Sequence, residues 1–330
     1  MILGLTGKNA AGKGEVARVL VEGGFEYFSL SDEIRAELRK AGVEPSREAM
    51  IAEGRRLRSE FGLDVLARRV ATRFTFGANQ VVDSIRNPEE VKYLRTCNDF
   101  FLVAVDAPPE VRFARAQGRA RPGDPVDQRG FIEAEQQELQ SKDPAAQQLL
   151  ATIAMADFVV MNASDMESLR RSVVNVFREA ARRLTRPGWD EYFMKIAEVV
   201  ATRSSCAKRR VAAVVVKDRR LISTGYNGTP RGTPNCAEGG CERCLSLAPP
   251  GTGLDDCLCS HAEENAIVQA AYHGVSLRGA TLYCTFMPCL HCAKMIINSG
   301  IAEVVYRSDY PLPEAAAGLL AAGGVLVRKL

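Results

Sequence analysis

The feature that most constrains this chain is a pair of short segments that carry the ligands zinc prefers. The first holds His261 with Glu263 two positions later, and the second reads Pro288-Cys289-Leu290-His291-Cys292. Zinc takes nitrogen and sulfur ligands, and a catalytic site keeps one of four positions open for water. His261, Cys289 and Cys292 would supply the other three. Because Cys289 and Cys292 are three residues apart, a helix would place them on one face.

The residues beside these ligands indicate how the site would work. Pro288 favours a helix start, which puts both thiolates at a helix N-terminus, where the dipole stabilises negative charge. Glu263 is interpreted as a proton carrier, since residues two apart on a helix point to roughly opposite sides. It can take a proton from a zinc-activated water and pass it to a leaving group. A closed structural site would need a fourth cysteine or histidine, and His291 would face away from the cysteines.

Composition sets the class of protein. A chain of 330 residues that is 46% hydrophobic and 25% charged is typical of a globular protein with two domains. The net charge of +3 is too small to indicate a nucleic-acid surface. No apolar run reaches transmembrane length and no signal peptide is visible, so we expect a cytoplasmic protein without a membrane partner. Of the 10 cysteines only Cys97 lies in the first half, which favours metal sites over a disulfide framework.

The N-terminus reads as a strand, a glycine-rich loop and a helix. Residues 2–5 form a buried strand, and the spacing from Gly7 to Gly12-Lys13 is that of a P-loop. Backbone N–H groups would cradle phosphates while Lys13 reaches across them, so the predicted nucleotide contacts are Gly7, Gly12, Lys13 and Gly14. The usual Ser or Thr that holds magnesium is replaced by Gly14 and Glu15. Magnesium binding and phosphoryl transfer therefore stay open.

Alternating strands and helices predict that residues 1–185 form a doubly wound α/β domain with a parallel sheet. The predicted core strands lie at 80–85, 100–105 and 157–161, and Ser31-Asp32 is expected to cap a helix that begins at Glu33. Arginines follow at positions 112, 115, 119 and 121. Together with the P-loop, these segments resemble nucleoside-monophosphate kinases and dephospho-coenzyme-A kinase. The resemblance implies that the arginines belong to a lid.

A break at 185–188 predicts a second domain over residues 186–330. Helices are expected at 189–201, at the two ligand segments and at 313–322, with strands at 210–217, 221–226, 280–285, 302–307 and 324–327. This order predicts an α/β/α arrangement with helices on both faces of a sheet. Both ligand-bearing helices follow strands, so their N-termini should converge at one end of the sheet.

Several motifs of this second domain occur together in one known family. They are Trp189 to Met194, the loop Gly225-Tyr226-Asn227-Gly228, and the strand 281–285 that leads into Pro-Cys-x-x-Cys. With the His-x-Glu segment, they resemble the deoxycytidylate (dCMP) deaminases of the zinc cytidine-deaminase superfamily. The resemblance implies hydrolysis of dCMP to dUMP and ammonia by a homo-oligomer. It also implies that Asn227 contacts the sugar, Arg203 and Ser204 the phosphate, and Phe286 the base.

A second group of cysteines lies between the Asn227 loop and His261. Its members are Cys236, Cys241, Cys244, Cys257 and Cys259. Five thiols in a segment rich in glycine and proline predict a closed structural zinc site, and the resemblance implies a second zinc here. We expect Cys236, Cys241 and Cys244 as ligands, with Cys257 or Cys259 completing the site.

The role of the P-loop domain has several interpretations. The resemblance implies a regulatory nucleotide site, because deoxycytidylate deaminases are commonly switched by dCTP and dTTP; ATP is a further candidate. The alternatives are a bifunctional nucleotide kinase–deaminase and an antiviral deaminase that depletes dCTP and dCMP. A polynucleotide deaminase would need a channel and flanking-base contacts, and no basic stripe is visible. A non-enzymatic nucleotide sensor is disfavoured because His261, Glu263, Cys289 and Cys292 are all present.

Overall fold

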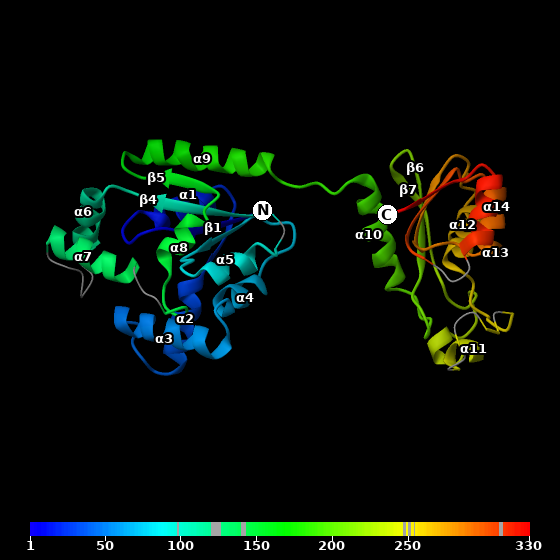
Figure 1. The fold of residues 1–330 in the computed structure, drawn as a ribbon, viewed down its shortest axis with the longest axis horizontal. Helices are drawn as coiled ribbons and strands as arrows, with labels where there is room; N and C mark the ends of the chain where they lie inside the picture. The colour runs from blue at the N-terminus through cyan, green and yellow to red at the C-terminus, as the bar shows by residue number, and fades with distance from the viewer. Residues whose placement is uncertain are drawn as a thin grey trace. The chain divides into compact units, whose positions relative to one another are not determined.

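The computed structural model of this chain describes residues 1–97, 99–119, 127–139, 143–246, 249, 252–253, 255–309 and 313–330. They divide into two compact units, Met1–Thr185 and Arg186–Leu330. Each unit contains one five-stranded sheet with helices, so the predicted α/β class is confirmed (Figure 1). Arg121, which belongs to the predicted lid, lies outside the described residues.

Unit 1 is built on a parallel sheet with the strand order β2-β3-β1-β4-β5. The strands are β1 (Ile2–Thr6), β2 (Glu26–Ser29), β3 (Gln80–Asp83), β4 (Phe100–Asp106) and β5 (Phe158–Met161). The helices are α1 (Lys13–Glu22), α2 (Leu30–Lys40), α3 (Arg47–Phe61), α4 (Val65–Ala71), α5 (Pro88–Leu94), α6 (Pro109–Arg119), α7 (Gln128–Leu139), α8 (Leu149–Ala154) and α9 (Met166–Arg182). All five residues of β1 are buried, as expected for a central strand covered on both faces.

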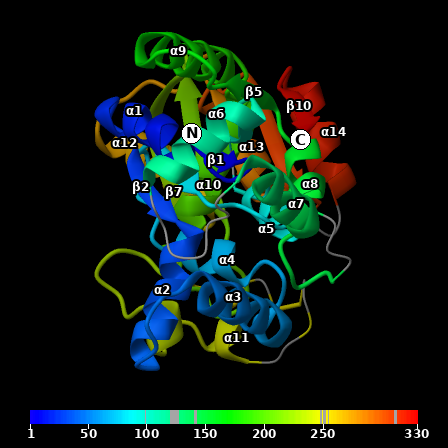
Figure 2. The ribbon, with the colours of Figure 1, turned by 90° about the vertical axis from the view of Figure 1, so that its left-hand side faces the viewer.

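The two faces of this sheet pack against different helices. Leu3 and Leu5 of β1 share a core with α1 and α9, while Ile2 shares a core with α2, α3, α4 and α5. Figures 1 and 2 show α9 on one side of the sheet and α2, α3 and α4 together on the other. The sheet is therefore doubly wound, and the loop after β1 opens at the carboxyl edge of the strands.

The start of α2 differs from the sequence-based expectation. The helix begins at Leu30, capped by Ser29, and not at Glu33 after Ser31-Asp32. The chain passes from β2 into α2 without a loop, because Ser29 keeps the extended strand conformation (φ −133°, ψ 127°) as it caps. Ser31 and Asp32 therefore lie in the first turn, where Asp32 pairs with Arg35. Acidic residues in the first turn interact favourably with the helix dipole. Asp32 therefore still indicates a helix start, although it is not the cap.

Unit 2 contains a mixed sheet with the order β10-β9-β8-β6-β7. Its elements are α10 (Trp189–Ala201), β6 (Ala212–Lys217), β7 (Arg220–Tyr226), a 3-10 helix η1 (Cys236–Glu238), α11 (Glu242–Leu245), α12 (Ala262–Tyr272), β8 (Thr281–Phe286), α13 (Leu290–Asn298), β9 (Glu303–Ser308), α14 (Pro313–Ala322) and β10 (Leu326–Lys329). β6 runs antiparallel to β7 and β8, whereas β8, β9 and β10 are parallel. The order of elements is the predicted one, with η1 and α11 added inside the cysteine-rich insert.

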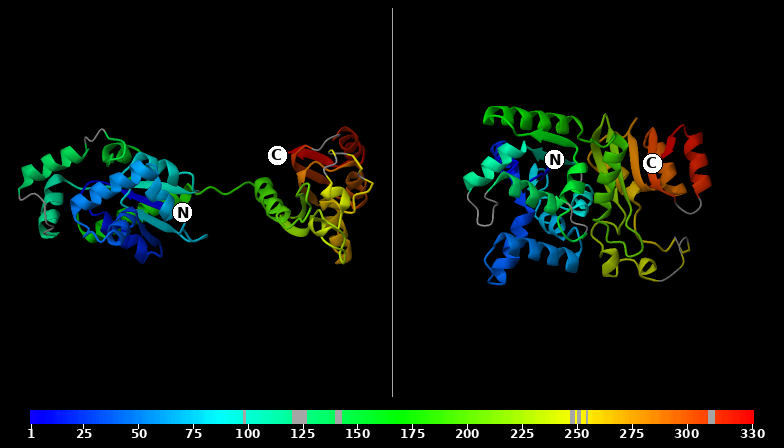
Figure 3. Two further views of the ribbon diagram at one scale, coloured as in Figure 1. Left: turned by 90° about the horizontal axis from the view of Figure 1, so that it is seen from below. Right: turned by 60° about the vertical axis from the view of Figure 1, so that its left-hand side comes forward.

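Alternation along β6 separates the two cores of unit 2. Ala213 and Val215 pack with α12, α13 and α14, whereas Val214 and Val216 pack with α10. Figure 3 shows α10 on one face of the sheet and the other three helices on the opposite face. This period of two is the expected pattern for a strand buried on both sides. No helix among the described residues has the length and apolar character needed to cross a membrane.

The backbone of β7 lies directly against α12 at Gly225. A Cβ atom placed there would lie 2.1 Å from the carbonyl oxygen of Ala262 and 2.3 Å from the backbone nitrogen of Ala266. The Ser223 hydroxyl donates to the carbonyl oxygen of Ala266 at 2.6 Å and fixes the same contact. Glycine at position 225 therefore determines how closely the N-terminus of α12 approaches the sheet.

We expect Gly225→Ala to destabilise unit 2 by about 3 kcal/mol, because the clash is with backbone atoms that cannot rotate away. The measurement is the urea unfolding midpoint of the full chain. Gly318→Ala is the matched control, because its added methyl meets no heavy atom within 4 Å. Alanine within helix α14 should stabilise by about 1 kcal/mol at most. Equal effects of the two substitutions would contradict the close packing of β7 on α12.

Candidate active site

His261 is positioned by its place at the start of α12. It is the N-cap residue, with an extended backbone (φ −76°, ψ 159°), and Glu264 Oε2 accepts its backbone N–H at 3.1 Å. The preceding residue, Ser260, pairs with Gly228 through two backbone hydrogen bonds of 2.9 and 3.2 Å. The imidazole is therefore carried by a segment that is fixed on both sides.

Cys289 and Cys292 come from the first turn of α13. Cys289 is the N-cap and Cys292 is fully buried. The Nδ1 atom of His261 lies 3.3 Å from the Cys289 sulfur and 3.4 Å from the Cys292 sulfur. One nitrogen and one sulfur ligand of a tetrahedral zinc ion are about 3.5 Å apart. The three ligand atoms therefore fit one zinc ion and leave its fourth position to a water molecule. His291 is exposed, as predicted.

Glu263 lies beside these ligands, in the first turn of α12. Its side chain is 4% exposed, and Oε2 lies 3.6 Å from the Cys292 sulfur. The expected separation on opposite helix faces does not apply, because His261 precedes the helix in an extended conformation. Burial raises the pKa of the Glu263 carboxyl. A carboxyl group with a raised pKa next to a metal-activated water is suited to accept and return a proton near neutral pH.

The three ligand groups shift one another's pKa values. The hydrogen bond from Cys292 and the neighbouring His261 lower the pKa of Cys289 to about 3. The hydrogen bond to Cys289 raises the pKa of His261 to about 9. Cys289 is therefore a thiolate at neutral pH, the form that binds zinc, whereas the hydrogen bond to Cys289 raises the pKa of Cys292. Zinc takes neutral imidazole and thiolate, so metal binding would release the protons of His261 and Cys292.

Comparison with known proteins gives the family. The model described as "Cytidine and deoxycytidylate deaminase zinc-binding region" matches residues 187–308. The deoxycytidylate deaminase of Schizosaccharomyces pombe is 38% identical to this chain over 255 residues, which cover 76% of each protein. The chain belongs to the deoxycytidylate deaminase family. The S. pombe alignment is longer than unit 2 of this deaminase, so the likeness extends into unit 1.

Shorter relatives of this deaminase are also similar. The deoxycytidylate deaminase of Mycobacterium phage D29 is 48% identical over 131 residues, covering 38% of this chain and 99% of the phage protein. A solved dCMP deaminase of cyanophage S-TIM5, in complex with dCMP and dUMP, is 35% identical. It covers 44% of this chain and 99% of its own, with a TM-score of 0.38. This family membership identifies the deaminase as a zinc-binding enzyme.

Two of the predicted substrate contacts of this deaminase bind each other. The Ser204 hydroxyl lies 2.8 Å from both the backbone oxygen and the side-chain Oδ1 of Asn227. Asn227 Oδ1 also accepts the backbone N–H of Val211, and Nδ2 donates to the carbonyl oxygen of Arg209. Ser204 is 3% exposed. These contacts favour a positioning role for Ser204 over the predicted direct phosphate contact, and they leave one N–H of Asn227 for a ligand.

The other two predicted contacts lie at different depths. Arg203 is exposed after the end of α10. Phe286 is half-buried at the end of β8, and the guanidinium of Arg209 lies 4.7 Å from the centre of its ring. A cation held over an aromatic face is a favourable contact. The sequence contains no pattern that pairs Arg209 with Phe286, so Arg209 was not among the predicted residues.

The structure adds a residue to the predicted second metal site. Cys236, Cys241, Cys244, Cys257 and Cys259 lie together, and Cys206, which precedes β6, joins them. Cys206 was not predicted because it lies outside the insert. The cysteine count nevertheless gave a signal. Without Cys97, Cys284 and the active-site pair, an even number of cysteines remains, namely Cys206 and the five of the insert. The structure places all five predicted ligands in one cluster of side chains.

The segment predicted as a P-loop joins β1 to α1 in a conformation that requires glycine. Gly7 (φ +137°) and Gly12 (φ +97°) have positive φ, and a Cβ atom at either would meet Val105 or Asn162 at about 2 Å. A Cβ atom at Gly14 would meet no heavy atom within 4 Å, so a side chain there has room. The Glu15 carboxylate accepts from Arg18 at 2.7 Å on the exposed surface of α1. Glu15 is therefore engaged by a neighbour one turn along the helix.

The side chain of Lys13, the first residue of α1, reaches back into this loop. Its ammonium group donates to the carbonyl oxygens of Gly7 at 2.8 Å and Lys8 at 2.9 Å. Burial and the nearby Arg86 lower its pKa to about 8, with smaller contributions from Arg119 and Arg112. The carboxylate of Asp83 acts in the opposite direction and raises this pKa. Three arginines against one carboxylate leave an excess of positive charge around Lys13, which favours an anion.

Proposed function

We propose that this chain hydrolyses dCMP to dUMP and ammonia at the site formed by His261, Glu263, Cys289 and Cys292. The observation that carries the proposal is the buried Glu263 carboxyl beside three zinc ligands, in a chain of the deoxycytidylate deaminase family. The named relatives favour this reaction over a polynucleotide deaminase, a nucleotide-depleting deaminase and a kinase–deaminase.

The chemistry divides between the metal and the chain. His261, Cys289 and Cys292 would hold the zinc ion, which would supply a Lewis acid that makes water nucleophilic near neutral pH. The carboxyl group of Glu263 takes the proton that water loses as its oxygen bonds to C4 of the cytosine. The same group delivers that proton to N3. It then takes the proton of the new C4 hydroxyl and delivers it to the amine as the C4–N bond breaks, so C4=O forms, ammonia leaves and the carboxyl returns to its starting state.

Substrate recognition is proposed for the loops around this centre. The remaining N–H of Asn227 is directed to the sugar, while Phe286 packs against the base and Arg203 meets the 5′-phosphate. Ser204 holds Asn227 in place through its hydroxyl, whose single proton is shared between the backbone oxygen and Oδ1 of Asn227. Since Asn227 and Ser260 both border Gly228, the sugar contact and the His261 ligand are connected by one short paired segment.

For unit 1 we propose a regulatory nucleotide site. The loop with Gly7, Gly12 and Lys13 would bind the phosphates of dCTP, dTTP or ATP, with magnesium as a partner of those phosphates. Convergence of Lys13 with three arginines supports anion binding. The exposed pairing of Glu15 with Arg18 supports a binding role without phosphoryl transfer, because the usual hydroxyl ligand for magnesium is absent.

We expect the zinc-loaded full chain to release ammonia from dCMP. The measurement compares dCMP, dCTP, cytidine and single-stranded DNA, each with and without ATP, dCTP and dTTP. Turnover of dCMP above the others, changed by a triphosphate, is the expected result. Equal turnover of dCTP would favour the nucleotide-depleting alternative, and turnover of DNA alone would overturn the proposal.

A further inference from the structure

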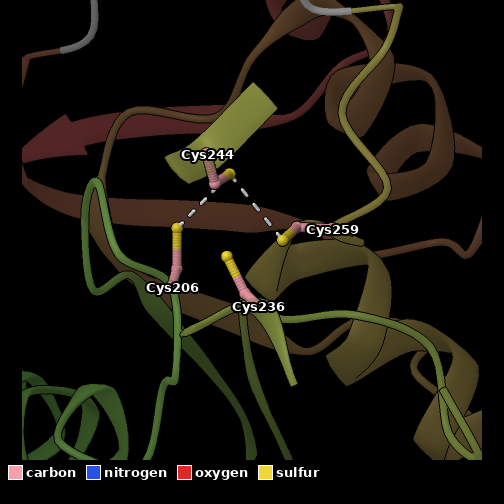
Figure 4. Close-up of side chains that lie close together, drawn as sticks. All are labelled: Cys206, Cys236, Cys244 and Cys259. Atoms are coloured by element: carbon pink, nitrogen blue, oxygen red, sulfur yellow. Dashed lines mark hydrogen bonds between the residues drawn. The ribbon is translucent and has the colours of Figure 1, made fainter. Parts of the chain in front are cut away.

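Six cysteine side chains converge beside the active site of unit 2. Cys206 comes from the segment before β6, Cys236 from η1, and Cys241 and Cys244 from the start and body of α11. Cys257 and Cys259 precede α12. All are buried except Cys257, which is half-buried. All ten cysteines of the chain are described, and none forms a disulfide. Figure 4 shows the sulfur atoms of Cys206, Cys236, Cys244 and Cys259 turned toward one another.

The six sulfur atoms form two groups of four that share two members. One group is Cys206, Cys236, Cys244 and Cys259, and the other is Cys241, Cys244, Cys257 and Cys259. Within each group every pair of sulfur atoms lies within 4.8 Å. The shared members are therefore Cys244 and Cys259.

The distances match those of tetrahedral zinc sites. A zinc–sulfur bond of about 2.3 Å places neighbouring sulfur atoms about 3.8 Å apart. The Cys244 sulfur lies 3.9 Å from Cys206, 3.7 Å from Cys257 and 3.9 Å from Cys259. Cys241 and Cys257 are 4.0 Å apart. Both groups are therefore near the spacing that a metal ion would impose.

We propose that these six cysteines hold two zinc ions in one cluster, with Cys244 and Cys259 bridging the two metals. Cys206 and Cys236 then complete one tetrahedron, and Cys241 and Cys257 complete the other. The sequence predicts a single zinc with Cys236 and Cys241 as ligands of the same ion. In the two groups these residues belong to different metals, and Cys257 and Cys259 are both used.

Ligand counting favours two metals over one. A single zinc ion takes four thiolates and leaves two further sulfur atoms against it, with no ligand role. Two zinc ions that share two thiolates use all six, and each ion keeps four sulfur ligands. Six thiolates and two divalent zinc ions together carry a net charge of −2. Loading releases the thiol protons to solvent.

The surroundings of the cluster suit that negative charge. The backbone N–H groups of Lys208 and Arg209 donate to the Cys206 sulfur. That of Leu258 donates to the Cys241 sulfur. The segment Lys208-Arg209-Arg210 lines a surface pocket that includes Cys206. Sulfur atoms in both groups are thus met by hydrogen-bond donors, which stabilise thiolates.

The test is the zinc content of the full chain, purified without chelator and measured by elemental analysis and native mass spectrometry. We expect three zinc ions per chain, one at the active site and two in the cluster. Two zinc ions per chain would overturn the bridged arrangement. The result does not depend on turnover, so failure of the proposed reaction and failure of this inference are distinguishable.

Single substitutions separate the two metals. Cys206→Ser and Cys257→Ser should each remove one zinc ion, because each residue belongs to a different group. Cys97→Ser is the matched control, since no metal group among the described residues contains it, and it should keep all three. If either cluster variant keeps the full complement, its group does not hold a metal and the inference is wrong.

A measurement on the unsubstituted chain keeps the inference testable even where variants misfold. Exchange of zinc for cadmium-113 should give two resonances typical of four sulfur ligands, coupled to each other through the bridging thiolates. A third resonance from the active site should disappear in His261→Ala. Two uncoupled all-sulfur resonances, or only one, would contradict bridging by Cys244 and Cys259.

Discussion

Replacing Glu263 by glutamine is expected to lower kcat for dCMP by roughly 10²- to 10⁴-fold, the usual contribution of a positioned acid–base group. Glutamine has nearly the same shape as glutamate but cannot exchange a proton at this position. His261, Cys289 and Cys292 are unchanged, so the zinc content should stay at the wild-type value. Steady-state kinetics with dCMP, together with zinc analysis of the same preparation, measures both quantities.

The matched control is Glu264→Gln, one position along the same helix. Glu264 accepts the backbone N–H of His261, and a glutamine oxygen can accept the same hydrogen bond. We expect a change in kcat of less than about tenfold, since no proton transfer is lost. A loss of activity in Glu264→Gln equal to that in Glu263→Gln would contradict the specific role of Glu263. Retention of full activity in Glu263→Gln would do the same.

Nucleotide binding to unit 1 should weaken as the pH rises through about 8, the pKa to which burial and Arg86 lower that of Lys13. A phosphate group stabilises the protonated ammonium, so the bound state has the higher pKa. Above pH 8 binding must take up a proton, and the affinity falls by up to about tenfold per pH unit. Below pH 8 Lys13 adds no pH dependence. Calorimetric titration of ATP, dCTP and dTTP from below this pKa to well above it measures the profile.

Lys13→Met should weaken that binding by roughly 10- to 100-fold below pH 8, because a charged hydrogen bond is lost, and should flatten the profile above it. Lys40→Met is the control, since Lys40 pairs with Glu37 at the exposed end of α2. A nucleotide that binds Lys13→Met as tightly as the wild type would exclude the loop as its site.

The lowered pKa of Lys13 also makes the free energy of unfolding depend on pH. Between pH 8 and the ordinary lysine value of 10.5, unfolded chains bind more protons at Lys13 than folded ones. The contribution of Lys13 to the free energy of unfolding therefore rises with pH in this window. Below pH 8 both states are protonated and the burial penalty is fully present. Ligand binding and stability thus respond to Lys13 in opposite directions.

Strong local patterns made much of the fold predictable. The strand expected at 210–217 is observed as β6, and the helix expected at 189–201 is observed as α10. The start of α2 was wrong by three residues, because Ser29 acts both as the last residue of a strand and as a helix cap. Sequence patterns assign the end of a strand and the N-cap of a helix to different residues. Only the structure shows that Ser29 occupies both positions.

The metal ligands were predictable to different extents for a physical reason. His261, Cys289 and Cys292 stand at the starts of two helices, and the predicted order of strands and helices already placed these two N-termini at one end of the sheet. Cys206 joins the second group only because β6 and β7 fold back on each other. The hydrogen bond between Ser204 and Asn227 likewise depends on that long-range pairing. Contacts between distant segments leave no periodic trace in the sequence.

The paired residues Gly228 and Ser260 bring the two ends of the cysteine-rich insert side by side. The chain leaves the sheet at one point and returns to it at the neighbouring point, directly before His261. Because closing a longer loop adds little entropic cost, residues 229–259 can grow, shrink or be exchanged without displacing the catalytic helix. In β6, by contrast, a single inserted residue would be disruptive, because it would turn every following side chain to the opposite face of the sheet. We therefore expect related chains to differ from this one in length and in metal content mainly within residues 229–259. The sheet and the helices that carry the catalytic residues should stay the same.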